Sequence, residues 1–201
     1  MSDISLFEAM RTQRAIRRFA KDPVSDETIE TILKATVRAP SGSNRQPWYF
    51  LVVRDTEAKG KLANWFLRAW SSVYGDFDPA ELTQATRSGK VLAQNMAEVP
   101  VLILVCMEHR PEGPEPTDIT RGASIYPAVQ NLLLAARGLG LGTVLTTVHH
   151  RYENEVKQYL GIPENVETVA LIPIGYPAEG EHFGGSLRKP ITEVTFYDRW
   201  G

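Results

Sequence analysis

Arg14 and Arg17 lie in a short segment, residues 14–19, that also contains two apolar side chains, Ile16 and Phe19. If the segment is extended or turned, the two guanidinium groups can converge on one anion. A guanidinium group binds two phosphate oxygens side by side, whereas a lysine acts as a point charge. Ile16 and Phe19 are suited to anchor the segment in the core. The segment is therefore a candidate phosphate clamp.

A polar loop, residues 39–48, follows the next predicted helix and has the composition of a ligand-binding turn. Its serine hydroxyls and asparagine amide offer donors and acceptors that suit the edge of a flat, pyrimidine-like ring. Its glycine lets the backbone approach a ligand closely, and its prolines stiffen the turn. The residues concerned are Pro40, Ser41, Gly42, Ser43, Asn44 and Pro47.

Each stretch has a plainer interpretation when it is taken alone. Arginine-rich turns are usually solvated surface, and clusters of Pro, Gly, Ser and Asn usually mark ordinary loops. Short motifs of this kind also match many unrelated sequences. The two stretches flank one predicted helix, and this co-occurrence favours a binding site over two unrelated turns.

Length and composition are those of an ordinary globular protein. The chain has 201 residues, of which 43% are hydrophobic and 23% are charged. These values predict a single domain over residues 1–201 and exclude the disordered and fibrous classes. The net charge of −2 gives no electrostatic basis for binding nucleic acid or an anionic membrane, so neither is expected as a partner.

The single cysteine, Cys106, lies in an apolar run and is expected to be a small buried side chain in a reducing compartment. The N-terminal residues lack the basic and apolar regions of a secretory signal. The longest apolar run, residues 99–107, is too short to span a bilayer. We expect a cytoplasmic protein.

The hydrophobic pattern predicts about four strands among six or more helices. Strands are expected at residues 48–54, 100–107, 143–148 and 166–174. Helices are expected at residues 5–12, 25–37, 56–74, 80–98, 119–139 and 153–160. Pro127 predicts either a kink in the fifth helix or a true start near Tyr126. The mixture predicts an α+β fold or a three-layer sandwich.

Two segments carry further expectations. The proline-rich residues 108–118 are predicted to form a mobile loop that faces the substrate. Trp65 and Trp70 lie in the amphipathic helix 56–74, and two tryptophans in one such helix favour a subunit interface.

Three tempting motifs do not support other chemistries. Gly138, Gly140 and Gly142 follow a helix and precede a strand, which is the reverse of a dinucleotide-binding fingerprint. The pair His149 and His150 has no further ligands at recognisable spacing, so no metal is expected. The serines lack the Gly-x-Ser-x-Gly context of a hydrolytic nucleophile.

Six stretches of the chain, taken in order, resemble the signatures of the nitroreductase family of flavoproteins. They are residues 14–19 (RAIRRF), 39–48 (APSGSNRQPW), 129–136 (VQNLLLAA), 140–143 (GLGT), 174–177 (IGYP) and 188–190 (RKP). Any one of them is a weak signal, but six in register are highly specific and cover nearly the whole chain.

The resemblance implies a nitroreductase-like three-layer sandwich, with a central, mostly antiparallel sheet flanked by helices. It implies an interlocked homodimer with two FMN molecules at the interface. It also implies a ping-pong cycle in which NADH or NADPH reduces the flavin, leaves, and is replaced by a small-molecule electron acceptor. Nitroaromatics, quinones and similar electron-poor compounds are the expected acceptors.

The resemblance also assigns cofactor-binding residues. At the phosphate and ribityl end of FMN it places Arg14, Ala15 and Arg17, with Arg188 joining at the phosphate. In a loop that usually comes from the partner subunit and borders the ring it places Pro40, Ser41, Gly42 and Asn44. Near the N5 edge of the ring it places Leu145, Thr146 and Thr147.

Two positions depart from the family pattern. Many members have an arginine where this chain has Gln13, and many have a serine where it has Ala15. Each change removes a potential phosphate donor, so either FMN is held more weakly or other donors substitute.

No catalytic side chain is assigned, because the flavin itself carries the hydride chemistry. The alternatives are a flavin-binding or sensing protein without turnover, and a branch of the family with another flavin reaction, such as dehalogenation or heterocycle oxidation.

Overall fold

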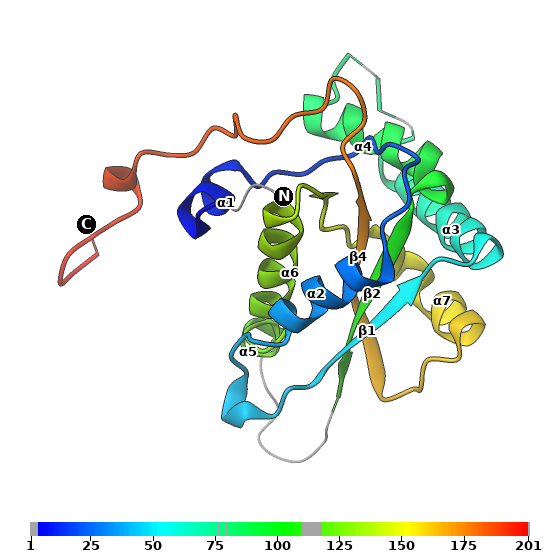
Figure 1. Ribbon diagram of the computed structural model, residues 1–201, viewed down its shortest axis with the longest axis horizontal. Coiled ribbons are helices and arrows are strands. Elements are labelled where there is room, and N and C mark those ends of the chain that lie inside the picture. Colours follow the sequence, from blue (N-terminus) through cyan, green and yellow to red (C-terminus); the bar gives the residue numbers. More distant parts are fainter. Residues whose placement is uncertain (1–3, 76, 79, 110–117, 201) are drawn as a thin grey trace.

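The computed structural model describes residues 4–75, 77–78, 80–109 and 118–200 (Figure 1). In chain order its α-helices and strands are α1 (Leu6–Thr12), α2 (Asp26–Thr36), β1 (Trp48–Val53), α3 (Thr56–Tyr74), α4 (Gln84–Asn95), β2 (Val101–Glu108), α5 (Asp118–Gly122), α6 (Tyr126–Gly138), β3 (Gly142–Thr143), α7 (Glu153–Leu160) and β4 (Val166–Gly175). Short 3-10 turns lie at Gly42–Asn44, Met96–Glu98, Val148–Tyr152 and Ile191–Glu193.

The four strands form one sheet in the order β1-β2-β4-β3, and every neighbouring pair is antiparallel. The central strands β2 and β4 are apolar over most of their length, residues 101–107 in β2 and 169–175 in β4, and helices cover both faces of the sheet. Successive side chains of a strand point to opposite faces. Ile103 and Val105 accordingly pack toward one core, and Leu102 and Leu104 toward the other.

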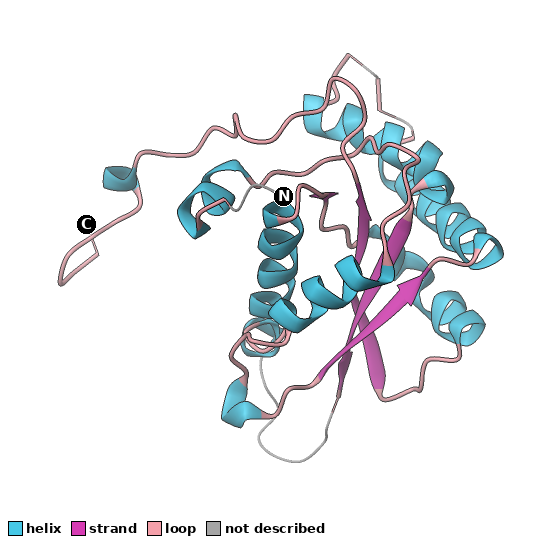
Figure 2. Cartoon of the chain, in the orientation of Figure 1, coloured by secondary structure: helices cyan, strands magenta, loops and turns pink. Residues whose placement is uncertain are grey.

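The first core lies between the sheet and the helices α2 and α6, and it includes Ile32 and Leu132. The second core lies between the opposite face and the helices α3, α4 and α7, and it includes Phe66, Leu92 and Val156. Figure 2 shows the resulting layers, with helices on both sides of the strands. The predicted three-layer α+β sandwich around an antiparallel sheet is confirmed.

Most predicted elements are present, but the fourth helix is shorter than expected. Instead of beginning near residue 80, α4 begins at Gln84, because the Thr83 hydroxyl accepts a hydrogen bond from the Thr86 amide and caps the helix there. It ends at Asn95 and continues as the 3-10 turn Met96–Glu98.

The predicted strand at residues 143–148 is wrong beyond Thr143. In the register that pairs Thr143 with Ile174, the next hydrogen-bonded position of β4 is Pro173, which has no amide hydrogen to donate. The ladder is interrupted there and resumes only at Thr146, which bridges Leu171. The chain then turns into the 3-10 turn Val148–Tyr152.

The long helix predicted at residues 119–139 is two helices. α6 begins at Tyr126 with Pro127 in its first turn, so a true start there, rather than a kink, is confirmed. α3 spans the predicted residues, yet its tryptophans pack within the chain. Trp70 is buried in the second core, and the ring of Trp65 lies edge-on to that of Tyr159.

Three further features complete the description. After residue 185 the chain leaves the body as an extended tail, seen in orange and red in Figure 1. Most of the predicted mobile loop, residues 110–117, lies outside the described residues. Within the described part of the chain, no helix is long and apolar enough to cross a membrane.

Candidate functional site

The arginine segment is anchored to the sheet by its middle residue. The Ile16 amide donates to the Thr143 carbonyl oxygen at 3.0 Å, and Ala15 forms a parallel bridge with the same residue. The Ile16 side chain is fully buried against Gly142, where an added Cβ would lie 2.7 Å from Ile16 Cγ2. Only glycine permits this approach, so Gly142 and Ile16 together set the height of the segment above the sheet.

With Ile16 turned inward, Arg14 and Arg17 both line a pocket of about 420 Å³ beside α4. Arg17 donates to the Ser88 hydroxyl at 3.2 Å, and burial, followed by the neighbouring charge of Arg14, lowers the pKa of its guanidinium. Among the described residues, neither arginine forms an ion pair, whereas Arg18 pairs with Glu181 at 2.7 Å. Arg87 and the paired Arg18 and Glu181 also line this pocket, so three of its arginines, Arg14, Arg17 and Arg87, have no ion-pair partner among the described residues, and a bound anion would be stabilised by them.

A second pocket, of about 280 Å³, adjoins the first because Arg17 lines both. Leu145, Thr146 and Thr147 form one wall of this pocket, and aromatic side chains of α3 form another. The Thr146 hydroxyl donates to the Leu171 carbonyl oxygen at 2.6 Å, so Thr146 ties this wall to β4. Thr147 is exposed. The fold thus brings the predicted phosphate and N5 groups together.

A buried histidine supports that wall from behind. His149 Nε2 lies 3.2 Å from the Thr168 hydroxyl, which itself donates to Glu153 at 3.0 Å. The hydroxyl proton is used by Glu153, so His149 Nε2 carries the hydrogen in this arrangement. Burial, with a smaller effect from His150, lowers the pKa of His149 to about 3. His149 is a neutral structural residue, and no cluster of metal-binding side chains is present among the described residues.

The polar loop is held at the far end of α6. The Gly42 amide donates to the Ser124 hydroxyl at 3.0 Å, and Ser124 lies just before α6 begins. Ser41 accepts from the Gln46 amide at 3.0 Å, which closes the turn. The arginine segment, by contrast, begins beside Arg137 in the last turn of α6.

The two predicted halves of the site are therefore separated along one helix. The 13 residues of α6 rise about 20 Å from one end to the other. Pro40, Ser41, Gly42 and Asn44 thus lie at the opposite end of α6 from the arginine segment.

Arg188 stands apart from both pockets. It lies on the exposed tail, and its guanidinium donates to the carbonyl oxygen of the adjacent Leu187 at 2.8 Å. The structure does not bring Arg188 to Arg14.

Sequence reasoning missed three residues that shape the clamp. They are Ser88, which binds Arg17, and Thr12 and Arg137, which fix the start of the arginine segment. Each lies in an ordinary helical pattern, so no local signal marks it.

Comparison with known proteins identifies the family of the chain. Residues 10–176 match the Nitroreductase family. The chain belongs to this family. It is 34% identical over 184 residues to a protein of Archaeoglobus fulgidus named "Putative NADH dehydrogenase/NAD(P)H nitroreductase", and the alignment covers 86% of this chain and 85% of the relative.

Two other members of the nitroreductase family are similar to the chain. A 5,6-dimethylbenzimidazole synthase of Rhodospirillum rubrum is 31% identical, with 89% of this chain and 87% of the relative covered. A crystal structure of oxidized iodotyrosine deiodinase bound to FMN and 3-iodo-L-tyrosine superposes with a TM-score of 0.78 at 25% identity, covering 98% of this chain and all of the other.

Proposed function

We propose that the chain is an FMN-dependent oxidoreductase that takes reducing equivalents from NADH or NADPH. In a ping-pong cycle it passes them to nitroaromatics, quinones or similar electron-poor acceptors. The observation that carries the proposal is the pair of arginines without carboxylate partners, next to a threonine-lined pocket. The names of the relatives support the nicotinamide donor.

The donor set fits the phosphate of FMN. Arg14 and Arg17 line one pocket, and Arg17 is partly buried there, which lowers the pKa of its guanidinium. A phosphate dianion bound there would compensate both charges with strong, charge-assisted hydrogen bonds. Ala15 offers only its backbone. The Ser88 hydroxyl donates to the Ala85 carbonyl oxygen at 2.9 Å and accepts from Arg17, so Ser88 holds Arg17 in place and does not replace the donors lost at Gln13 and Ala15.

The remaining residues orient the ring and exclude water. Leu145 and Thr147 would border one edge of the ring, and Phe66 and Trp70 close that pocket with apolar surface. When bound, FMN supplies the hydride and electron transfer chemistry. Among the described residues that line this pocket there is no carboxylate or imidazole, so we assign no acid or base.

A second copy of the chain would complete the site. Pro40, Ser41, Gly42 and Asn44 lie at the wrong end of α6 to reach the ring bound by their own arginines. The tail also carries highly exposed apolar side chains, including Leu187 at 95% and Trp200 at 89% exposure. We propose a homodimer in which each loop serves the partner's pocket, with Arg188 reaching a phosphate only in that assembly.

A second candidate function keeps the fold and changes the reaction. The similarity to a 5,6-dimethylbenzimidazole synthase and to an iodotyrosine deiodinase favours a branch that processes heterocycles or halogenated aromatics. A flavin-binding protein without turnover is the remaining possibility.

Anaerobic stopped-flow spectroscopy tests the proposal. Protein loaded with FMN is mixed with NADH or NADPH at millimolar concentration, and we expect the flavin absorbance to bleach. Addition of a nitroaromatic or a quinone should restore it. Bleaching without reoxidation by these acceptors, but with reoxidation by 3-iodotyrosine, would favour the second candidate. Protein that binds FMN and never bleaches would be a binding protein, and protein that takes up no FMN would contradict the proposal entirely.

A further inference from the structure

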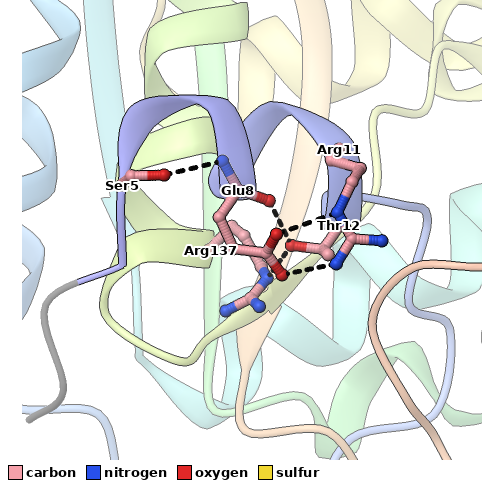
Figure 3. Close-up of polar contacts among 5 residues, drawn as sticks. All are labelled: Ser5, Glu8, Arg11, Thr12 and Arg137. Atoms are coloured by element: carbon pink, nitrogen blue, oxygen red, sulfur yellow. Dashed lines mark hydrogen bonds and ion pairs between the residues drawn. The ribbon is translucent and has the colours of Figure 1, made fainter.

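Thr12 occupies a central position at the end of α1, just before the arginine segment. Its hydroxyl donates to the Glu8 carbonyl oxygen at 2.6 Å and accepts from Arg137 Nε at 2.8 Å (Figure 3). Its carbonyl oxygen accepts from the Gly184 amide at 2.7 Å. Thr12 is buried, so these bonds are shielded from competition by water.

Gly184 connects Thr12 to Arg14 through its two backbone groups. While its amide donates to Thr12, its carbonyl oxygen accepts from Arg14 Nη1 at 3.2 Å. Gly184 adopts a left-handed conformation with φ of 82°, which is what turns its two backbone groups to these two partners. Arg14 Nη1 also lies 3.4 Å from His182 Nε2, and since a guanidinium group only donates, His182 must be the acceptor there.

Arg137, in the last turn of α6, binds this hydrogen-bonded group of Thr12, Gly184 and Arg14 from the side of the helix. Besides its bond to Thr12, its guanidinium lies 4.1 Å from the centre of the Phe183 ring. Arg137 thus contacts the two segments that meet at Arg14, namely the end of α1 and the residues around Gly184. Because Arg137 is on the long helix α6, these contacts fix the position of Arg14 relative to the core of the protein and not only to neighbouring residues.

We propose that Thr12 and Arg137 are positioning residues that preset Arg14 for phosphate binding, acting through Gly184. An arginine side chain loses considerable rotamer freedom when it binds a ligand. Gly184 and His182 already bind one amino group of the Arg14 guanidinium. The other N–H groups of Arg14 are therefore oriented before phosphate binds, and less rotamer entropy is lost on binding. The inference rests on the proposed function, because it concerns the phosphate of FMN, and it names residues that would not touch the cofactor.

The test compares FMN with riboflavin, which has the same ring and ribityl chain but no phosphate. We measure both dissociation constants by flavin fluorescence quenching in wild type, Arg137→Met and Thr12→Val. We expect either variant to raise the dissociation constant of FMN by roughly three- to tenfold, which corresponds to one lost hydrogen bond, and to leave that of riboflavin unchanged. Thr12→Ser, which keeps the hydroxyl, should restore wild-type affinity for FMN.

A matched control removes a charge that forms no bond with Thr12, Gly184 or Arg137. Arg11 is also on α1, and it forms an exposed ion pair with Glu8 through two bonds of 2.8 Å. Arg11→Met should leave both affinities unchanged. If it weakens FMN as much as Arg137→Met does, the effect is one of general charge and the proposal is wrong.

A glycine pair repeats the test if the first variants fold poorly. Gly180 and Gly184 share a φ of 82°, so alanine strains the backbone at both, and an added Cβ has room at both, since at Gly184 it would lie 3.6 Å from Thr12. They differ because strain at Gly184 would shift the amide and carbonyl groups that bind Thr12 and Arg14. Gly184→Ala should weaken FMN selectively and Gly180→Ala should not.

The outcomes separate this inference from the function on which it rests. If wild-type protein binds FMN no better than riboflavin, the phosphate clamp and the proposed function both fail. If wild type prefers FMN and Arg137→Met, Thr12→Val and Gly184→Ala all keep that preference, only the positioning role is refuted. Equal weakening of both flavins would show a purely structural role and would also overturn it.

Discussion

The two halves of the candidate site are built in opposite ways. Residues 14–17 are bound to the sheet, with Ile16 fully buried and its amide paired to Thr143. The loop around Gly42 is exposed, and Ser43 and Asn44 both adopt left-handed conformations, with φ of 52° and 54°. Non-glycine residues rarely adopt this conformation, and asparagine tolerates it best.

This contrast shows which half depends on the fold and which half faces outward. The arginines are located by packing in the core, so their position is a property of the single chain. The loop is located by its own turn and by one bond to Ser124, so it presents polar groups to whatever lies beyond the surface. Changes behind the first half should therefore act through stability and phosphate affinity, and changes in the second half mainly through assembly.

The largest effect is expected from acid, which should lower the free energy of unfolding through His149, the buried residue behind the wall formed by Leu145, Thr146 and Thr147. Burial holds the pKa of His149 at about 3, below its ordinary value of 6.5, so the folded protein binds fewer protons than the unfolded chain between these values. Stability is full above pH 6.5 and falls as the pH drops, by up to about 1.4 kcal/mol per pH unit. Urea unfolding of wild type and His149→Gln at pH 6.5 and pH 5 measures this contribution.

Two features make the measurement specific. Most carboxyl groups titrate below this range, so the difference between the two proteins isolates His149 from them. His150 and Glu153 are the titratable neighbours, and they are present in both. Equal pH dependence in the two proteins would show that His149 is not buried as a neutral ring.

An effect of about the same size is expected at the arginines. Arg14→Ala should weaken FMN binding by about 1.5 to 3 kcal/mol, because the phosphate loses a charged hydrogen bond that the single chain already positions. Arg188→Ala should have a comparable effect only in the dimer, since the structure places Arg188 on the exposed tail. FMN titrations of both variants, at protein concentrations above and below the dissociation constant of the proposed dimer, distinguish the effect of Arg14→Ala from that of Arg188→Ala. Wild-type affinity in both variants would place the clamp elsewhere.

The smallest effect is expected from Ser124→Ala. The substitution removes the bond to the Gly42 amide, which is worth about 0.5 to 1.5 kcal/mol, at an exposed loop that packs little core. We expect nearly unchanged thermal stability and a moderate loss of FMN affinity in the assembled protein. A large loss of thermal stability would mean that the loop is part of the core framework, and the contrast between the two halves would then be wrong.

Much of the fold could be predicted because its signals are local. The helix Thr56–Tyr74 shows its apolar face in sequence, and the strand Val101–Glu108 is apolar over most of its length. The errors come from distant or subtle partners. The strand after Thr143 ends early because of Pro173, thirty positions further along, and only the register of the sheet brings the two together.

The residues of the candidate site could be proposed from the sequence, and they stay a prediction, but their geometry could not be proposed. The arginines and the loop carry recognisable motifs, and the resemblance to nitroreductases placed the loop on a partner subunit. Nothing in the sequence alone shows that α6 holds the two halves apart. Thr12 and Arg137 left no signal, because a threonine at a helix end and an arginine in a last turn are common and their meeting depends on the tertiary fold.

The length of α6 also has a consequence for mixtures of variant chains. In the proposed homodimer, one site would take its arginines from the first chain and its loop from the second, and the other site would take the reverse. Suppose that one chain carries a defective arginine segment and the other a defective loop. Both defects then fall in the same site, and the other site is intact. Two inactive variants would thus complement each other, and each mixed pair would bind a single flavin.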